Sequence, residues 1–134
     1  MKLIPFDPAH IEQYTPSVWE DGLFDLDELR RVSKTWPGNA VTAMDDEGVV
    51  AIAAWSLDGS IAKVGMMLTD RIKAHPIYLM KQIKEGIELL HDYEIRVTCR
   101  SDYPTGLRWL GRFGFKPTGD VEQVKGIDLL EYAL

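Results

Sequence analysis

The sequence predicts an α+β fold, in which a mixed and mostly antiparallel sheet is flanked by helices. Asp58-Gly59 joins two apolar runs near the middle of the chain, which is a strong short-range signal for a β-hairpin. From residue 77 onward, apolar residues recur at steps of three and four, the period of a helix face. A chain of 134 residues is large enough for a single core, so we expect one domain over residues 1–134.

The N-terminal third predicts one strand and two helices. Lys2–Phe6 is a short strand that is stopped by prolines, and a helical segment then runs from Pro8 toward Tyr14 with Asp7 as its N-cap. Pro16 ends this segment. A second helix covers residues 25–32, because acidic residues lie in its first turn and basic residues in its last.

Three strands and a long helix follow. We place the strands at Ala40–Met44, Val49–Ser56 and Ser60–Leu68, and we expect the nearly all-apolar middle strand to be covered on both faces. The helix begins at Pro76. Its predicted apolar face consists of Ile77, Met80, Ile83, Ile87 and Leu90.

The last third predicts a strand, a short helix and two closing strands. Glu94–Cys99 alternates apolar and polar residues, as a strand does. The helix begins at Pro104 and ends at Gly114, a residue type that favours helix C-termini. The closing strands are Phe115–Val124 and Ile127–Ala133.

Composition excludes several function classes. A net charge of −6 argues against a nucleic-acid partner, because binding phosphates requires clustered Lys and Arg. The longest apolar run, Val49–Trp55, is far shorter than the ~20 residues of a membrane span, so we expect no membrane partner. The single Cys99 and the lack of an apolar leader favour a cytoplasmic location. The scattered histidines predict no metal site.

The order of elements, together with the segment Leu107–Pro117, resembles the GNAT superfamily of acyl-coenzyme A-dependent N-acyltransferases. That segment looks like the short fourth helix of the superfamily, which closes on an apolar residue, Gly and Phe. The resemblance covers nearly the whole chain. It implies that backbone amides after the fourth strand bind the pyrophosphate of acyl-coenzyme A, within a pattern of Arg or Gln, two residues, Gly, one residue, and Gly or Ala.

The stretch Arg71-Ile72-Lys73-Ala74-His75-Pro76 matches this pattern only at Arg71. Ala74 replaces the first Gly, and Pro76 replaces the second small residue and has no N–H to donate. We therefore expect a degenerate pyrophosphate loop. If acetyl-coenzyme A binds, the resemblance implies contacts with Met67, Leu68, Arg71, Lys73, Ala74 and His75.

The catalytic positions of the superfamily are also altered. Leu110 stands where many members have a general acid Tyr, and the fourth predicted strand contains no carboxylate. Asp58 and Tyr103 are the remaining catalytic candidates, although a turn explains Asp58 and packing beside Pro104 explains Tyr103.

A narrower resemblance is to small GNAT-like internal virion and assembly proteins of short-tailed phages. The positions that carry it are Tyr14-Thr15-Pro16, Lys81, Lys84, Arg108 and Phe113-Gly114. It implies a protein that acts by contact with phage structural proteins or with itself, in the host cytoplasm or the virion. Two alternatives stay open: an acetyl-coenzyme A-dependent N-acetyltransferase acting on a small amine or a protein amine, and a regulatory module that binds acyl-coenzyme A without turnover.

Two further groups of residues receive ordinary structural interpretations. The acidic run from Glu20 to Glu28, which includes Asp21, is interpreted as a solvated face followed by a helix start. The aromatic side chains are interpreted mostly as core. Trp19, Phe24 and Trp36 would become partner anchors if they were exposed.

Overall fold

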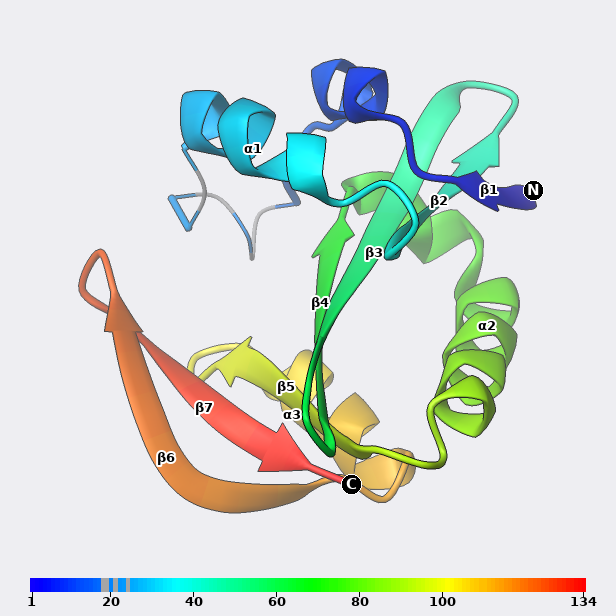
Figure 1. The fold of residues 1–134 in the computed structure, drawn as a ribbon. Helices are drawn as coiled ribbons and strands as arrows, with labels where there is room; N and C mark the ends of the chain where they lie inside the picture. Colours follow the sequence, from blue (N-terminus) through cyan, green and yellow to red (C-terminus); the bar gives the residue numbers. More distant parts are fainter. Residues whose placement is uncertain (18–19, 21, 24) are drawn as a thin grey trace. The chain divides into compact units, whose positions relative to one another are not determined.

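The computed structural model describes residues 1–17, 20, 22–23 and 25–134. Trp19, Asp21 and Phe24, which were included in the interpretations above, lie outside the described residues. The strands form one seven-stranded sheet in the order β1-β2-β3-β4-β5-β7-β6 (Figure 1). Pairing is antiparallel for β1–β2, β2–β3, β5–β7 and β6–β7, and parallel for β4–β5. The predicted α+β class is confirmed.

The predicted elements occur in the predicted order, with bounds that differ from the predictions by one or two residues, and the structure adds two short 3₁₀ segments, η2 and η3. The elements are β1 (Lys2–Pro5), η1 (Pro8–Gln13), α1 (Leu26–Val32), η2 (Ser33–Thr35), β2 (Ala40–Asp45), β3 (Gly48–Asp58), β4 (Ile61–Leu68), η3 (Asp70–Ala74), α2 (Pro76–Leu89), β5 (Glu94–Arg100), α3 (Pro104–Arg112), β6 (Lys116–Val124) and β7 (Ile127–Ala133).

The chain forms two compact units. The first contains Met1–Trp55 and Gly65–Lys81, and the second contains Ser56–Val64 and Gln82–Leu134. Three elements, β3, β4 and α2, therefore contribute residues to both units.

The first unit has a core on one face of the β1–β2–β3 ladder, where η1 and α1 lie beside each other (Figure 1). Asp7 starts η1 as predicted, because its side chain accepts a hydrogen bond from the Ala9 amide at 2.8 Å. The first half of β3 is buried, as expected for its apolar sequence. The core residues include Phe6, Ile11, Tyr14, Leu29, Ile52 and Met67, and Trp36 packs against them.

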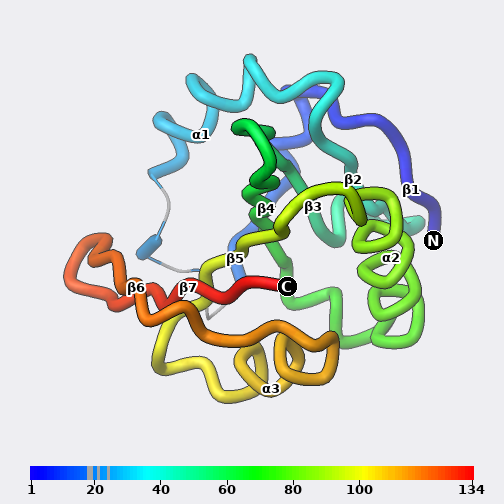
Figure 2. The backbone as a smooth tube through the Cα atoms, turned by 60° about the horizontal axis from the view of Figure 1, so that its bottom comes forward, coloured from blue at the N-terminus to red at the C-terminus, as the bar shows by residue number. Residues whose placement is uncertain are grey.

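The second unit is built on β5, which lies between two partners. Ile61–Lys63 of β4 pairs with Glu94–Arg96, and β7 pairs with β5 on the other side. The chain turns from α3 into β6 at Gly114, which has a φ of 91° and ends the helix as predicted (Figure 2). β6 is the outermost strand, and its register with β7 shifts between Pro117 and Val121.

The predicted apolar face of α2 was wrong at one position. Ile77 is 82% exposed, whereas Met80, Ile83 and Ile87 are half-buried. At 3.6 residues per turn, Ile77 lies roughly 120° around the helix from Ile83, so the two side chains do not share a face. Among the described residues, no helix is both long enough and apolar enough to cross a membrane.

Candidate functional site

The loop after β4 is tied to β3 by Thr69. This residue is buried, and both its amide and its hydroxyl donate to the carbonyl oxygen of Val50, at 3.0 and 2.8 Å. The η3 turn that follows uses further amides internally: Ile72 donates to Thr69, and His75 donates to Ile72. These amides are therefore committed to the loop itself and are not available to a ligand.

The start of α2 leaves two amides available. Leu79 donates to the carbonyl oxygen of His75 at 3.1 Å, whereas Ile77 and Tyr78 have no acceptor within the described part of the chain. Amides in the first turn of a helix point out of its N-terminus, where the helix dipole favours an anion. Pro76 contributes no N–H to this group. Part of an anion-binding geometry thus remains, but its amides belong to Ile77 and Tyr78, which follow the positions where the family has its glycines.

Two predicted phosphate-binding side chains are held by acidic residues instead. The guanidinium of Arg71 forms ion pairs with Asp45 and with Glu47, the latter with an Nη1–Oε2 distance of 2.8 Å. The Nε2 atom of His75 lies 3.1 Å from a carboxylate oxygen of Asp45. Both acids come from the end of β2 and the turn that follows it. Arg71 and His75 therefore face the protein's own carboxylates.

The other predicted cofactor residues differ in their surroundings. Lys73 and Ala74 are exposed on η3. Met67 is buried in the core, so only its backbone could contact a ligand.

Leu68 lies at the end of β4, and its amide is hydrogen-bonded to the carboxylate of Glu20, which sequence analysis did not place there. Because the Thr69 amide points toward β3, strand alternation points the backbone groups of Leu68 toward the opposite edge. There the Leu68 amide donates to Glu20 Oε2 at 2.7 Å, and its carbonyl oxygen accepts from the Ser17 amide at 3.0 Å. The sequence of β4 contains no carboxylate, but the fold supplies one from a preceding loop.

The position of Glu20 follows from a tight turn, in which its amide donates to the Ser17 carbonyl oxygen at 3.0 Å. The interpretation of Glu20 as part of a solvated face was wrong, because the residue is half-buried and its carboxylate is hydrogen-bonded within the protein. No periodic pattern places a loop carboxylate against a strand 48 residues later. Its place four residues after Pro16, directly after the apolar pair Val18-Trp19, is the only signal that the sequence offers.

Buried Tyr14 and half-buried Glu20 form a hydrogen-bonded pair. The Tyr14 hydroxyl donates to Glu20 Oε2 at 2.7 Å, and Tyr14 is only 5% exposed. Burial raises the pKa of Glu20 to about 7, although hydrogen bonds from Tyr14, Leu68 and Ser17 act in the opposite direction. Burial, followed by the charge of Glu20, raises the pKa of Tyr14 above its usual value. A carboxylate that titrates near neutral pH is suited to accept a proton.

The two catalytic candidates from the sequence lie in the second unit. Asp58 is exposed at the end of β3, in the predicted turn. Tyr103 precedes α3, and a side chain at Gly106 would come within 2.6 Å of its ring. Their catalytic roles stay predictions. Leu110, at the family's Tyr position, is half-buried.

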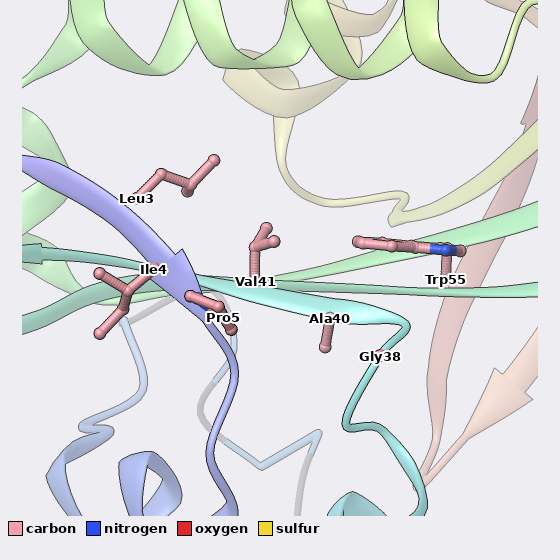
Figure 3. Close-up of a pocket in the computed structure, with 7 residues that line it drawn as sticks. All are labelled: Leu3, Ile4, Pro5, Gly38, Ala40, Val41 and Trp55. Atoms are coloured by element: carbon pink, nitrogen blue, oxygen red, sulfur yellow. The ribbon is translucent and has the colours of Figure 1, made fainter.

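An apolar cavity of about 390 Å³ lies on the β1–β3 part of the sheet. Figure 3 shows that Leu3, Val41 and Trp55 project from the same face of this sheet. None of the residues around it has a titratable side chain, so the cavity offers apolar contact and no acid–base chemistry; they are Leu3, Ile4, Pro5, Gly38, Ala40, Val41 and Trp55. Within the described residues, no group of three or more His, Cys, Asp or Glu could hold a metal ion.

Comparison of the sequence with protein-family models and with curated proteins gives no match. Comparison of the structure gives many. Ard1 from Thermoplasma volcanium matches with a TM-score of 0.75 and 14% identity, over 99% of this chain and 95% of that one. The ribosomal-protein-S18-alanine N-acetyltransferase from Escherichia coli matches with a TM-score of 0.74 and 10% identity, over 99% and 92%.

A third structure contains a ligand. The yncA protein from Salmonella typhimurium, solved with its cofactor acetyl-coenzyme A, matches with a TM-score of 0.62 and 15% identity, over 100% of this chain and 92% of that one. At these identities the likeness concerns the fold. The chain has the fold of the GNAT acetyltransferases.

Proposed function

We propose that this protein is an acyl-coenzyme A-dependent N-acyltransferase that uses Glu20 as its proton acceptor. The observation that carries the proposal is the half-buried carboxylate of Glu20, whose pKa burial raises to about 7 and which is hydrogen-bonded to the last residue of β4. The loop and helix start that follow β4 keep two amides for an anion. All these groups belong to the first unit. The acetyltransferases among the similar structures support this function over one without catalysis.

Phosphate binding falls to the start of α2. The amides of Ile77 and Tyr78 would bind phosphate oxygens, assisted by the helix dipole and by the exposed side chain of Lys73. Acetyl-coenzyme A would supply an acyl group activated as a thioester.

Glu20 gives the site its acid–base chemistry. An amine must be neutral before its nitrogen can attack a thioester carbonyl carbon. The Glu20 carboxylate accepts one proton from the ammonium group, and the neutral nitrogen then forms the new N–C bond. As the C–S bond breaks, the second proton of that nitrogen passes to the leaving sulfur, which departs as the thiol. The Tyr14 hydroxyl holds the carboxylate in place through its 2.7 Å hydrogen bond.

Replacement of Glu20 by Gln tests this function. The Gln side chain can still accept from the Leu68 amide but cannot take up a proton at neutral pH. For wild type we expect acetyl transfer from acetyl-coenzyme A to a panel of small amines and amino-terminal peptides, measured by thiol release, with a rate that rises as pH increases through about 7. Glu20→Gln should lower kcat by roughly 10²- to 10⁴-fold without changing the Kd of acetyl-coenzyme A.

Glu28→Gln is the matched control, because Glu28 is exposed on α1. It should leave the rate unchanged. If acetyl-coenzyme A failed to bind in calorimetry, or if Glu20→Gln kept the wild-type rate and pH profile, the proposed function would be wrong.

One observation favours a second candidate, a protein that acts by contact without catalysis. Arg71 is paired with Asp45 and Glu47, and Pro76 removes an amide, so the loop has lost donors that the family uses. The partner would be a phage structural protein or another copy of the chain. If acetyl-coenzyme A showed no binding in the calorimetry described above, this candidate would be favoured.

A further inference from the structure

The β2–β3 turn and the loop after β4 meet in a cluster of charges. Arg71 pairs with both Asp45 and Glu47, and Asp45 also contacts His75. The Asp45 side chain is only 16% exposed, so its interaction with Arg71 is weakly screened by solvent, whereas Glu47 is 80% exposed. The Nε atom of Arg71 is buried and has no hydrogen-bond partner in the described part of the chain. The Asp45–Arg71–Glu47 arrangement thus holds the guanidinium firmly without satisfying all of its donors.

The charge balance of this cluster opposes an anionic ligand. Three carboxylates, those of Asp45, Glu47 and Asp70, lie on or against a loop whose permanent cations are Arg71 and Lys73. One negative charge is in excess when His75 is neutral. A diphosphate entering this loop would meet repulsion from the acids and would find Arg71 already paired.

We propose that Asp45 and Glu47 are affinity-determining residues of the phosphate loop, which hold Arg71 away from the phosphates of acyl-coenzyme A and weaken its binding. This inference rests on the proposed function, since it concerns the same loop. It predicts that the pairing of Arg71 with the acids and the binding of phosphates exclude each other. Removing an acid should therefore tighten binding, the opposite of the usual effect of disturbing a binding loop.

The test is calorimetric titration of the full-length protein with two ligands, acetyl-coenzyme A and S-acetylpantetheine, which has the same thioester arm but no phosphates. Asp45→Asn removes the buried acid, and Glu47→Gln removes the exposed one and perturbs folding least. For acetyl-coenzyme A we expect Asp45→Asn to bind at least about tenfold tighter than wild type, the size of one charge-assisted hydrogen bond regained. Glu47→Gln should give a smaller gain in the same direction. Neither variant should change the affinity for S-acetylpantetheine.

A second substitution tests whether the gain passes through Arg71. Adding Arg71→Ala to Asp45→Asn, or to Glu47→Gln if Asp45→Asn does not fold, should return the affinity for acetyl-coenzyme A to the wild-type value or below it. If wild type binds acetyl-coenzyme A and the acid variants bind it equally or more weakly, the inference is overturned and the proposed function stands. If no protein binds either ligand, the proposed function fails and the inference fails with it.

Discussion

Two opposing effects of the fold set the pKa of Glu20. Burial favours its neutral form, whereas hydrogen bonds from Tyr14, Leu68 and Ser17 favour the carboxylate. Burial is the larger effect, and it raises the pKa from 4.5 to about 7. Ionisation of Glu20 is therefore energetically unfavourable in the folded protein, relative to the unfolded chain, at the pH where the carboxylate would accept a proton.

The cost of ionising Glu20 should make the stability of the protein depend on pH. The folded protein binds the Glu20 proton more tightly than the unfolded chain does, so its contribution to stability is complete below about pH 4.5 and is lost as pH rises through about 7. The loss is on the order of 3 kcal/mol. Urea unfolding of wild type and Glu20→Gln between pH 4 and 8 should show the free energy of unfolding of wild type falling relative to that of the variant. A constant difference would contradict the shifted pKa.

Tyr14→Phe examines the same pair from the other side. The ring stays in the core while the hydroxyl, a donor to Glu20, is lost. Because a hydrogen bond to a charged acceptor contributes about 1.5–3 kcal/mol, the substitution should destabilise the protein more at pH 8 than at pH 4, where Glu20 is neutral. Equal destabilisation at both values, measured by the same urea titrations, would mean that the hydroxyl does not act on the charged form.

At the scale of elements, the neighbours of Gly106 in α3 leave no room for a side chain at this position. A Cβ at Gly106 would lie 2.6 Å from one Tyr103 ring carbon and 2.9 Å from the Cys99 sulfur. Cys99 itself is half-buried, and burial raises the pKa of its thiol to about 11, which favours the protonated thiol at neutral pH. The close approach of α3 to β5 therefore requires glycine at position 106.

Two alanine substitutions in this helix should have opposite effects. Gly106→Ala gains helix propensity of about 1 kcal/mol but should be destabilised overall, because overpacking costs typically 1–3 kcal/mol and the new Cβ would lie closer than 3.0 Å to both Tyr103 and Cys99. Gly111→Ala meets no atom within 4 Å and should be neutral or stabilised by up to about 1 kcal/mol. Thermal melts of the two variants check this. A stabilised Gly106→Ala would show that Tyr103 moves aside freely.

The elements could be predicted because their signals are local. Asp7 with Pro8, Asp58-Gly59 and Gly114 each act within a few residues, and the structure places η1, the β3–β4 turn and the end of α3 at these positions. The candidate site could not be predicted in the same way. Glu20 contacts a strand 48 residues away, and Arg71 is paired with a turn 24 residues before it. Such contacts depend on which faces the fold brings together, which no residue period encodes.

At the scale of the whole molecule, a ligand that binds only the folded state must stabilise it. Acetyl-coenzyme A at about a hundred times its Kd should add ~2.7 kcal/mol. For a domain of this size the thermal midpoint should rise by roughly 5–15 °C. Differential scanning fluorimetry with and without acetyl-coenzyme A measures the shift. Adenosine diphosphate, which carries the diphosphate alone, is the control for the phosphate loop, and it should give a smaller rise. An unchanged midpoint with both ligands would contradict the proposed function.

The outer strand β6 has a consequence for how copies of the molecule meet. An edge strand exposes unpaired amides and carbonyls, and long regular edges let sheets of different molecules join and aggregate. Here Pro117 lacks an amide, and Gly119, with a φ of 93°, lies where the register with β7 shifts. The same strand also carries three charged side chains, those of Lys116, Asp120 and Glu122. Another strand that approached this edge would find few consecutive backbone partners, so we expect β6 to resist edge-to-edge association in solution.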